Sequence, residues 1–261
     1  MTEAIGRAAN AHGQWEDALA FEARLAGTSG RARLAARLTA IEAFRRVHTA
    51  HGGDDEVRAR AALAAGRHLT TLGFDGEAYE QFDAAVRLAI GDAQRFEARA
   101  ARADASRRAE DWAGAERDYA WCADTGRGVE RVVALLRLGD ARSALGEPRR
   151  AHDAWVRAIE LGDACTELVE VYDRVAREAL ARGDDAAAAG WLEACRAALR
   201  EPLASRTPQG ERIRRAFVAM RARHELRCRA FERAVFDEAL HDVVIDDAVL
   251  DDALFDDASR E

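Results

Sequence analysis

The residues that come nearest to a metal site are His48, His51, Asp54 and Asp55, where two histidines three residues apart precede two acids. Imidazole and carboxylate groups are ordinary ligands of zinc and related ions. The acids have a simpler explanation, because Asp is preferred at the start of a helix, where its side chain accepts a backbone hydrogen bond. We therefore predict that Asp54 or Asp55 caps a helix and that no metal binds here.

A second pair, Glu238 and His241, has the Glu-x-x-His spacing of carboxylate-bridged iron proteins, but it lacks the partner carboxylates that such sites take from other helices. The sequence also contains no phosphate-binding glycine loop with lysine, no nucleophile elbow, no paired-histidine zinc motif and no calcium loop. The four cysteines are about thirty or more residues apart, without metal-binding or redox spacing. We predict no catalytic residue, no metal, no cofactor and no enzyme activity.

The elements that position the remaining polar residues are predicted to be helices. Segments rich in Ala, Arg, Leu and Glu, with apolar residues at spacings of three and four, fill nearly the whole chain between short breaks. Gly ends helices well, whereas Asp and Pro begin them, and the breaks combine these residues, as in Gly146-Glu-Pro148 and Gly183-Asp-Asp185. The pattern predicts an all-α protein.

One helix pair recurs along the chain. Small residues in the second helix of each pair are spaced 37, 36 and 37 residues apart, at Ala78, Ala115, Ala151 and Ala188. Bulky apolar residues follow four positions later on the same helix face, at Phe82, Tyr119, Trp155 and Leu192. Turn residues stand five positions before the small residues, at Gly73, Glu110, Gly146 and Gly183. A fixed period of this length predicts a solenoid in which each pair buries its apolar face against the next.

This unit resembles the tetratricopeptide repeat. The best copy spans residues 135–158, with the pair Leu138-Gly139 in the first helix and the run Ala151, Trp155, Ala158 in the second. A second good copy contains Gly66, Gly73, Ala78, Phe82 and Ala85. The period is longer than the family's 34 residues, and Gly-Asp pairs replace its closing proline. The resemblance implies a right-handed α-solenoid of helix-turn-helix repeats with a long C-terminal capping helix.

The predicted parts of the chain are N-terminal helices with a divergent repeat at 1–54, tetratricopeptide-like repeats at 55–200, a linker at 201–210, a basic amphipathic helix at 211–240 and an acidic-hydrophobic tail at 241–261. In the first part, Gly6, Gly13 and Ala18 fit the family's spacing, and the distance from Ala18 to Ala78 requires one additional helix at 31–49. In the basic helix, the apolar stripe Ile213, Phe217, Met220, His224, Cys228, Phe231 and Val235 makes His224 a core residue.

In the tetratricopeptide family the first helices line a concave surface that binds peptides or helices. The resemblance maps these residues to that surface: Arg60, Arg67, Thr70, Glu97, Asp104, Arg107, Arg108, Asp140, Ser143, Glu170, Asp173 and Arg177. Its N-terminal half is predominantly basic and its C-terminal half acidic. The surface is either a solvated mixture of charges or a site in which arginines, best Arg60 and Arg67 with Arg107 and Arg108, clamp the carboxylates of an acidic peptide.

Charge is unevenly distributed at the C-terminal end. Residues 237–261 contain ten acids and one Arg, a net charge of −9, whereas residues 206–233 contain nine Arg and three Glu, a net charge of +6. The acidic tail alternates apolar and paired Asp residues, with apolar members at Ile245, Leu250, Leu254 and Phe255. It is a docking segment for another protein or for this chain's own basic groove, or else a helical cap or frayed end.

These features predict a non-catalytic adaptor or scaffold that binds a protein or peptide partner on its concave face. The alternative is a regulatory nucleic-acid-associated protein, in which the Arg-rich helix binds phosphates through Arg212, Arg214, Arg215, Arg221 and Arg223 and is masked by the tail. The pI of about 5.5 speaks against that alternative. Because the sequence shows no secretory signal and no run of apolar residues long enough to span a membrane, we predict a cytoplasmic location.

Overall fold

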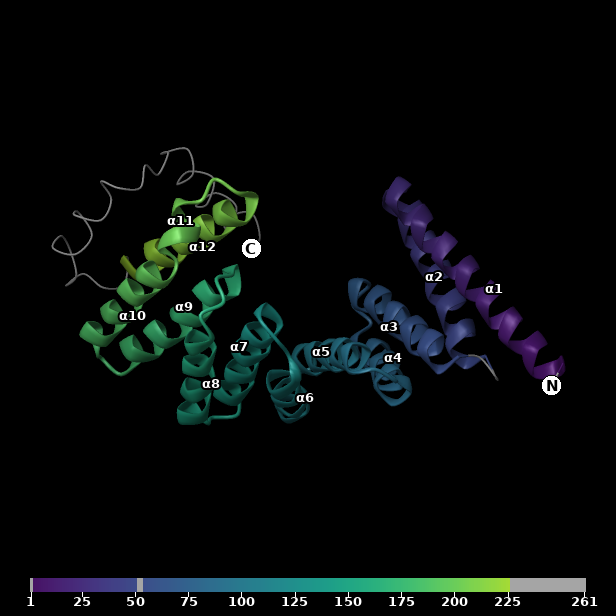
Figure 1. Ribbon diagram of the computed structural model, residues 1–261, viewed down its shortest axis with the longest axis horizontal. Helices are drawn as coiled ribbons and strands as arrows, with labels where there is room; N and C mark the ends of the chain where they lie inside the picture. The colour runs from purple at the N-terminus through teal and green to yellow at the C-terminus, as the bar shows by residue number, and fades with distance from the viewer. Residues whose placement is uncertain (1, 51–53, 226–261) are drawn as a thin grey trace. The chain divides into compact units, whose positions relative to one another are not determined.

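The computed structural model describes residues 2–50 and 54–225, with side chains from residue 13 onward (Figure 1). These residues form helices joined by short turns, and no strand occurs among them. The prediction of an all-α helical-repeat fold is therefore confirmed. Contacts divide the chain into two compact units, residues 1–126 and 127–261, which are described separately.

The first unit contains three antiparallel helix pairs. Its helices are α1 (Thr2–Arg24), α2 (Gly30–Thr49), α3 (Asp55–Thr71), α4 (Asp75–Leu88), α5 (Asp92–Arg108) and α6 (Trp112–Thr125), with the short 3-10 helix η1 (Leu25–Gly27) after α1. Each helix packs against the next one in the chain. The additional helix predicted at 31–49 is α2. Gly13 lies inside the continuous helix α1 and not at a turn, so the first pair, α1 with α2, departs from the family's spacing.

Apolar side chains and one buried ion network hold the first unit together. Phe44 and Val47 of α2 are fully buried in a cluster with Ala18, while Phe82 of α4 lies in a second cluster shared by helices α2 to α5. In the network, the guanidinium of Arg102 in α5 donates two hydrogen bonds to the buried carboxylate of Asp118 in α6, at 2.7 and 2.8 Å. It donates a third to Asp83 of α4, at 2.6 Å, and so links three consecutive helices.

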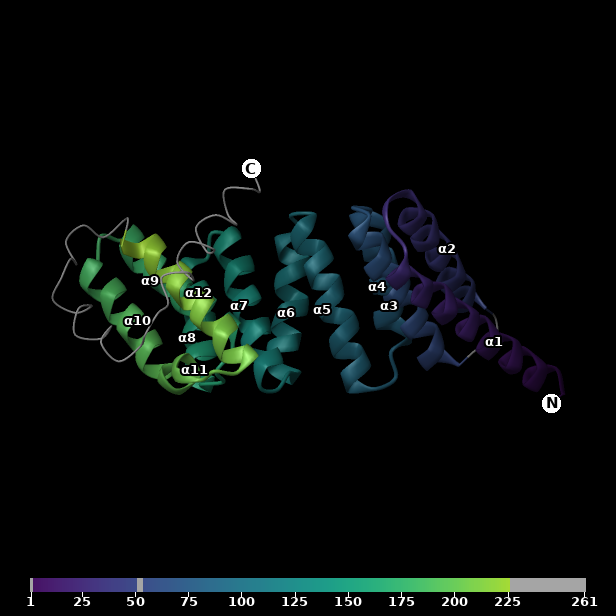
Figure 2. The ribbon, with the colours of Figure 1, turned by 90° about the horizontal axis from the view of Figure 1, so that it is seen from above.

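The second unit continues the same pattern with α7 (Val129–Ala144), α8 (Pro148–Leu161), α9 (Thr166–Ala181) and α10 (Asp185–Ala198). The short helix α11 (Arg200–Ala204) and the longer α12 (Pro208–Glu225) follow. The segment 201–210 therefore differs from the predicted linker, because only residues 205–207 lie outside helices and α12 begins at Pro208. Helix α12 packs against α9 and α11, as Figure 2 shows for α9.

A close approach of the two helices explains the glycine in the first helix of two repeats. A Cβ atom on Gly139 of α7 would lie 2.2 Å from Nε1 of Trp155 in α8, and one on Gly66 of α3 would lie 2.4 Å from the ring of Phe82 in α4. The indole Nε1 donates a hydrogen bond to the backbone oxygen of Leu136, at 3.3 Å. The bulky residue of the second helix thus occupies the space that a glycine leaves on the first.

The predicted turn residues all adopt the left-handed conformation. Gly73, Gly146 and Gly183 have φ values of 79°, 77° and 74°, and Glu110 has the same type of conformation at 59°. A side chain is disfavoured in this region, so the turn before α6 departs from the glycine that the other three repeats use.

The Gly139→Ala substitution should test this packing. We expect it to destabilise the second unit by about 1 to 3 kcal/mol, because the added methyl group overlaps the Trp155 ring. Gly190→Ala in α10 is the matched control, since a Cβ there meets no atom within 4 Å and should stabilise the helix by up to about 1 kcal/mol. Urea unfolding followed by circular dichroism measures both; equal effects of the two substitutions would contradict the packing.

Candidate interaction surface

The exposed side of α3 carries the two predicted anchors. Eight of the 17 residues of this helix are buried, whereas Arg60 and Arg67 are exposed and lie two helical turns apart on one side. Arg60 forms an ion pair with Glu56 of its own helix at 2.7 Å, and Arg67 pairs with Glu97 of α5. Both arginine side chains are 58% exposed. The structure thus places Arg60, Arg67 and Glu97 on one solvent-facing surface of the first unit.

Arg108 is engaged within the first unit. Its Nε donates to Oδ1 of Asp75 in α4 at 2.7 Å, and its Nη2 donates to the hydroxyl of Thr70 in α3 at 3.2 Å. This predicted clamp residue therefore ties the end of α5 to the turn between α3 and α4.

Asp104 and Arg107 form a second connection from α5. The Tyr119 hydroxyl of α6 donates to Oδ1 of Asp104 at 2.5 Å, and Arg107 lies 3.8 Å from the same carboxylate. Burial and the neighbouring charge of Asp104 raise the pKa of Tyr119 well above its ordinary value, so its hydroxyl remains a donor. Asp104 is thus held in place by its own repeat.

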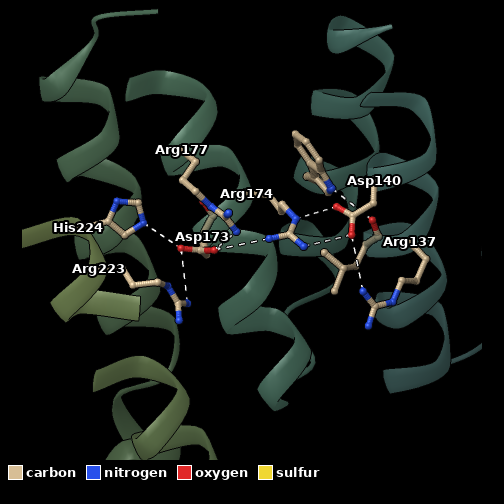
Figure 3. A network of polar contacts seen from close by, with 9 residues as sticks. Arg137, Asp140, Asp173, Arg174, Arg177, Arg223 and His224 are labelled. Carbon is tan, nitrogen blue, oxygen red and sulfur yellow. Dashed lines mark hydrogen bonds and ion pairs between the residues drawn. The ribbon is translucent and has the colours of Figure 1, made fainter. Parts of the chain in front are cut away.

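In the second unit, the predicted inner-face acids lie inside a network of arginines (Figure 3). Asp140 of α7 accepts two hydrogen bonds from Arg174 of α9, from Nε at 2.7 Å and from Nη2 at 3.3 Å. Arg137, one turn before Asp140 on α7, approaches the same carboxylate at 3.6 Å. Asp140 therefore links the first helices of two consecutive repeats.

Asp173 is the buried centre of this network. Only 3% of the residue is exposed, and its Oδ1 lies 3.0 Å from Nε2 of His224 in α12. Arg177 contacts Oδ2, while Arg174 and Arg223 approach the carboxylate at 3.6 and 3.8 Å. The acids in the C-terminal half of the inner face are therefore compensated by Arg177 and by three arginines that were not mapped from the sequence, Arg137, Arg174 and Arg223.

The prediction that His224 is a core residue is confirmed, because only 2% of it is exposed. Ile213 and Met220 of the same stripe are buried as well. The remainder of that stripe, from Cys228 onward, lies outside the described residues. What the sequence reasoning missed is the partner of His224. A signal was present, because the position fifteen residues before the repeated alanine is Leu63, Ala100 or Leu136 in the other repeats and an acid only at Asp173.

The surroundings of Asp173 determine its ionisation. Burial alone raises the pKa of this carboxyl, but the hydrogen bond with His224 and the charges of Arg177 and Arg223 outweigh burial and hold the pKa below its ordinary value. The folded-state pKa is thus lower than the unfolded value of about 3.9. The carboxylate stabilises the folded state above about pH 4, and this contribution is lost as the pH falls through the folded-state pKa.

Asp173→Asn should therefore reduce the free energy of unfolding of the second unit at pH 7 by about 1 to 3 kcal/mol, because the buried donors around position 173 lose a charged acceptor. Urea denaturation measures this change. The difference from the wild-type chain should shrink as the pH is lowered to about 2.5. Asp153→Asn, at an exposed position of α8, is the control and should change little at either pH. A pH-independent difference for Asp173→Asn would show that the carboxylate charge is not what holds α12.

The candidate metal ligands that lie among the described residues have structural roles. Asp54 is the N-cap of α3 and accepts a hydrogen bond from the backbone N–H of Glu56 at 2.9 Å, which confirms the capping prediction. His51, Glu238 and His241 lie outside the described residues. Within the described ranges, no group of three or more His, Cys, Asp or Glu residues is arranged to hold a metal ion.

The described cysteines all lie in the packed interior. Cys122 and Cys195 are fully buried, and Cys165 is buried as well. Burial raises the pKa of the Cys165 thiol to about 11 and that of Cys195 above its ordinary value. Both thiols are therefore protonated at neutral pH and unreactive.

The structure gives the nucleic-acid alternative no support. In the described part of the basic helix, Arg214 donates to the backbone oxygens of Leu203 and Ser205, at 2.5 and 3.1 Å, and Arg223 faces Asp173. These arginines fasten α12 to its own unit. The tail residues Ile245, Leu250, Leu254 and Phe255 lie outside the described residues. Over the residues the structure describes, no helix is long and apolar enough to cross a membrane.

No known family model and no curated protein matches the sequence. Two crystal structures of MamA match the fold, with TM-scores of 0.52 and 0.51 at 17% and 18% sequence identity. The matches cover 66% and 64% of this chain and 95% and 85% of the MamA chains. At this level of identity the likeness concerns the fold. Together with the repeated helix pairs and their glycine-bulky contacts, it shows that this chain has a tetratricopeptide-like helical-repeat fold.

Proposed function

We propose that the chain is a non-catalytic interaction scaffold that holds an acidic peptide or helix of a partner protein on the inner face of its first helices. Arg60 and Arg67 are its principal anchors. The observation that carries the proposal is that the exposed side of α3 presents these two guanidinium groups two turns apart, while its other sides pack against α2 and α4.

The present partners of these arginines favour exchange with a ligand. Glu56 and Glu97 are about half exposed, as are the arginines, and ion pairs between exposed groups contribute only about 0 to 1 kcal/mol. A partner's carboxylate that is desolvated on binding can form a charge-assisted contact of about 1.5 to 3 kcal/mol with the same guanidinium. When carboxylates of the partner displace Glu56 and Glu97, the binding free energy gained from the new contacts therefore exceeds the free energy lost with the exposed ion pairs.

The other inner-face residues have different roles in this proposal. Thr70 and Asp104 hold Arg108 and Arg107 in place, and Asp140 and Asp173 do the same for Arg174 and Arg177. The acids of the surface thus orient arginines, and it is the arginines that meet the partner. The described cysteines are buried thiols, which suits the reducing cytoplasm in which we place this scaffold.

Peptide selection on the immobilised full chain tests the proposal. Random peptides of about 15 residues, displayed and selected for binding, should become enriched in Asp and Glu, because guanidinium groups form the contact surface. The double substitution Arg60→Glu with Arg67→Glu should then weaken binding of a selected peptide at least tenfold in a fluorescence anisotropy titration.

The control is Arg87→Glu with Arg117→Glu, which makes the same change of charge at exposed positions of the second helices α4 and α6. It should leave the affinity within about twofold, because exposed charges away from the contact act weakly at physiological salt. Selection of neutral or basic peptides, or an equal loss of binding in both double variants, would refute the assignment of the anchors.

A further inference from the structure

The inner face of the second unit carries more positive than negative charge. Four arginines, Arg137, Arg174, Arg177 and Arg223, surround the two carboxylates of Asp140 and Asp173 (Figure 3). Glu170, which also acts on Arg174, reduces the surplus without removing it. We call these four arginines the basic cluster. They come from three helices, α7, α9 and α12, which all belong to the second unit.

The two ends of the basic cluster are open to a further anion. Arg137 and Arg223 approach Asp140 and Asp173 at 3.6 and 3.8 Å, which is beyond hydrogen-bond distance. Their side chains are 29% and 56% exposed. Each guanidinium has five N–H donors in a planar fork that fits a carboxylate. The cluster can therefore bind carboxylates from solvent at both ends while its centre stays fixed on Asp173.

The chain itself carries a matching segment close by. Arg223 and His224 stand in the last described turn of α12, against Asp173, and the acidic residues begin at Asp237. Asp237 follows Glu225 by twelve positions, and an extended chain spans about 3.3 Å per residue, or about 40 Å in all. Residues 237–261 have a net charge of −9. Length and charge thus allow this segment to reach the cluster.

We propose that the acidic tail of the same chain, with its paired Asp residues, docks on the basic cluster and masks this part of the inner face. The inference rests on the proposed function in taking the inner face as the binding surface, and it adds the regulation of that surface. A tethered segment acts at an effective concentration of about a millimolar, so even weak docking excludes weak acidic competitors. A partner must then be more acidic, or bind with additional contacts, to displace the tail.

The test uses full-length chains and a fluorescent peptide of residues 243–261 as the probe. In the neutralised chain, the tail residues Asp246, Asp247, Asp251, Asp252, Asp256 and Asp257 are replaced by Asn. We expect the peptide to bind the neutralised chain at least tenfold more tightly than the wild-type chain, whose own tail competes, and to be released by about 0.5 M salt.

Two further substitutions in the neutralised chain locate the site. Arg137→Gln with Arg223→Gln should weaken peptide binding at least tenfold, whereas Arg149→Gln with Arg200→Gln, an equal change of charge at exposed positions of α8 and α11, should not. Equal binding by wild-type and neutralised chains, no binding by either, or equal loss in the two double variants overturns the proposal. Masking that weakens on dilution of the wild-type chain also overturns it, because the tail would then belong to a second copy.

The outcomes separate this inference from the proposed function. In one outcome, no acidic peptide is selected through Arg60 and Arg67, but the tail peptide binds the neutralised chain through Arg137 and Arg223. The scaffold proposal is then wrong and the tail contact is supported. In the other outcome, acidic peptides bind through Arg60 and Arg67, but the tail peptide binds the wild-type and neutralised chains with equal affinity. The scaffold proposal is then supported and the masking proposal is wrong.

Discussion

The fold depends on one requirement, which is that a helix pair cannot bury its apolar face alone. Two of the pairs close through a bulky side chain of the second helix that fills the place of a missing Cβ on the first, as Trp155 does at Gly139 and Phe82 at Gly66. The outer faces of the closed pair must then pack on the next pair. This requirement sets the repeat period and holds the first helices against their neighbours within each unit.

The first helices pack against their neighbours on several sides, and part of their charge lies on the remaining face. On α3 that face holds Arg60 and Arg67, and on α9 it holds Arg174 and Arg177. The first helices of consecutive repeats contact each other, which brings Arg67 to Glu97, 30 positions later, and Arg174 to Asp140, 34 positions earlier. The ion pairs of the inner face are thus a consequence of the repeat packing and form within each unit.

The sequence was sufficient to predict the parts of the structure that depend on periodicity. The small and bulky residues of the second helices, the turn at Gly146, the helix at 31–49 and the cap at Asp54 all follow from local patterns, and all were predicted. The pairing of charges was not, because it depends on which helices meet. Asp173 and His224 are 51 residues apart, and their contact requires α12 to lie on α9, which no periodic pattern specifies. The arginines that pair with Asp140 and Asp173, Arg137, Arg174 and Arg223, were missed for the same reason.

The end of the array shows why the polar pairing matters. Elsewhere the repeat position of Asp173 holds Leu63 or Leu136, which are buried in apolar contacts. At the last repeat, α12 supplies Ile213 and Met220 to cover apolar surface and His224 to meet the acid. A buried charge contact adds little net stability, but an unpaired buried charge is costly. Positions of α12 on α9 that separate His224 from Asp173 are therefore disfavoured. Asp173 therefore directs where α12 sits, and by drawing Arg223 toward α9 it completes a basic surface that the repeats alone do not form.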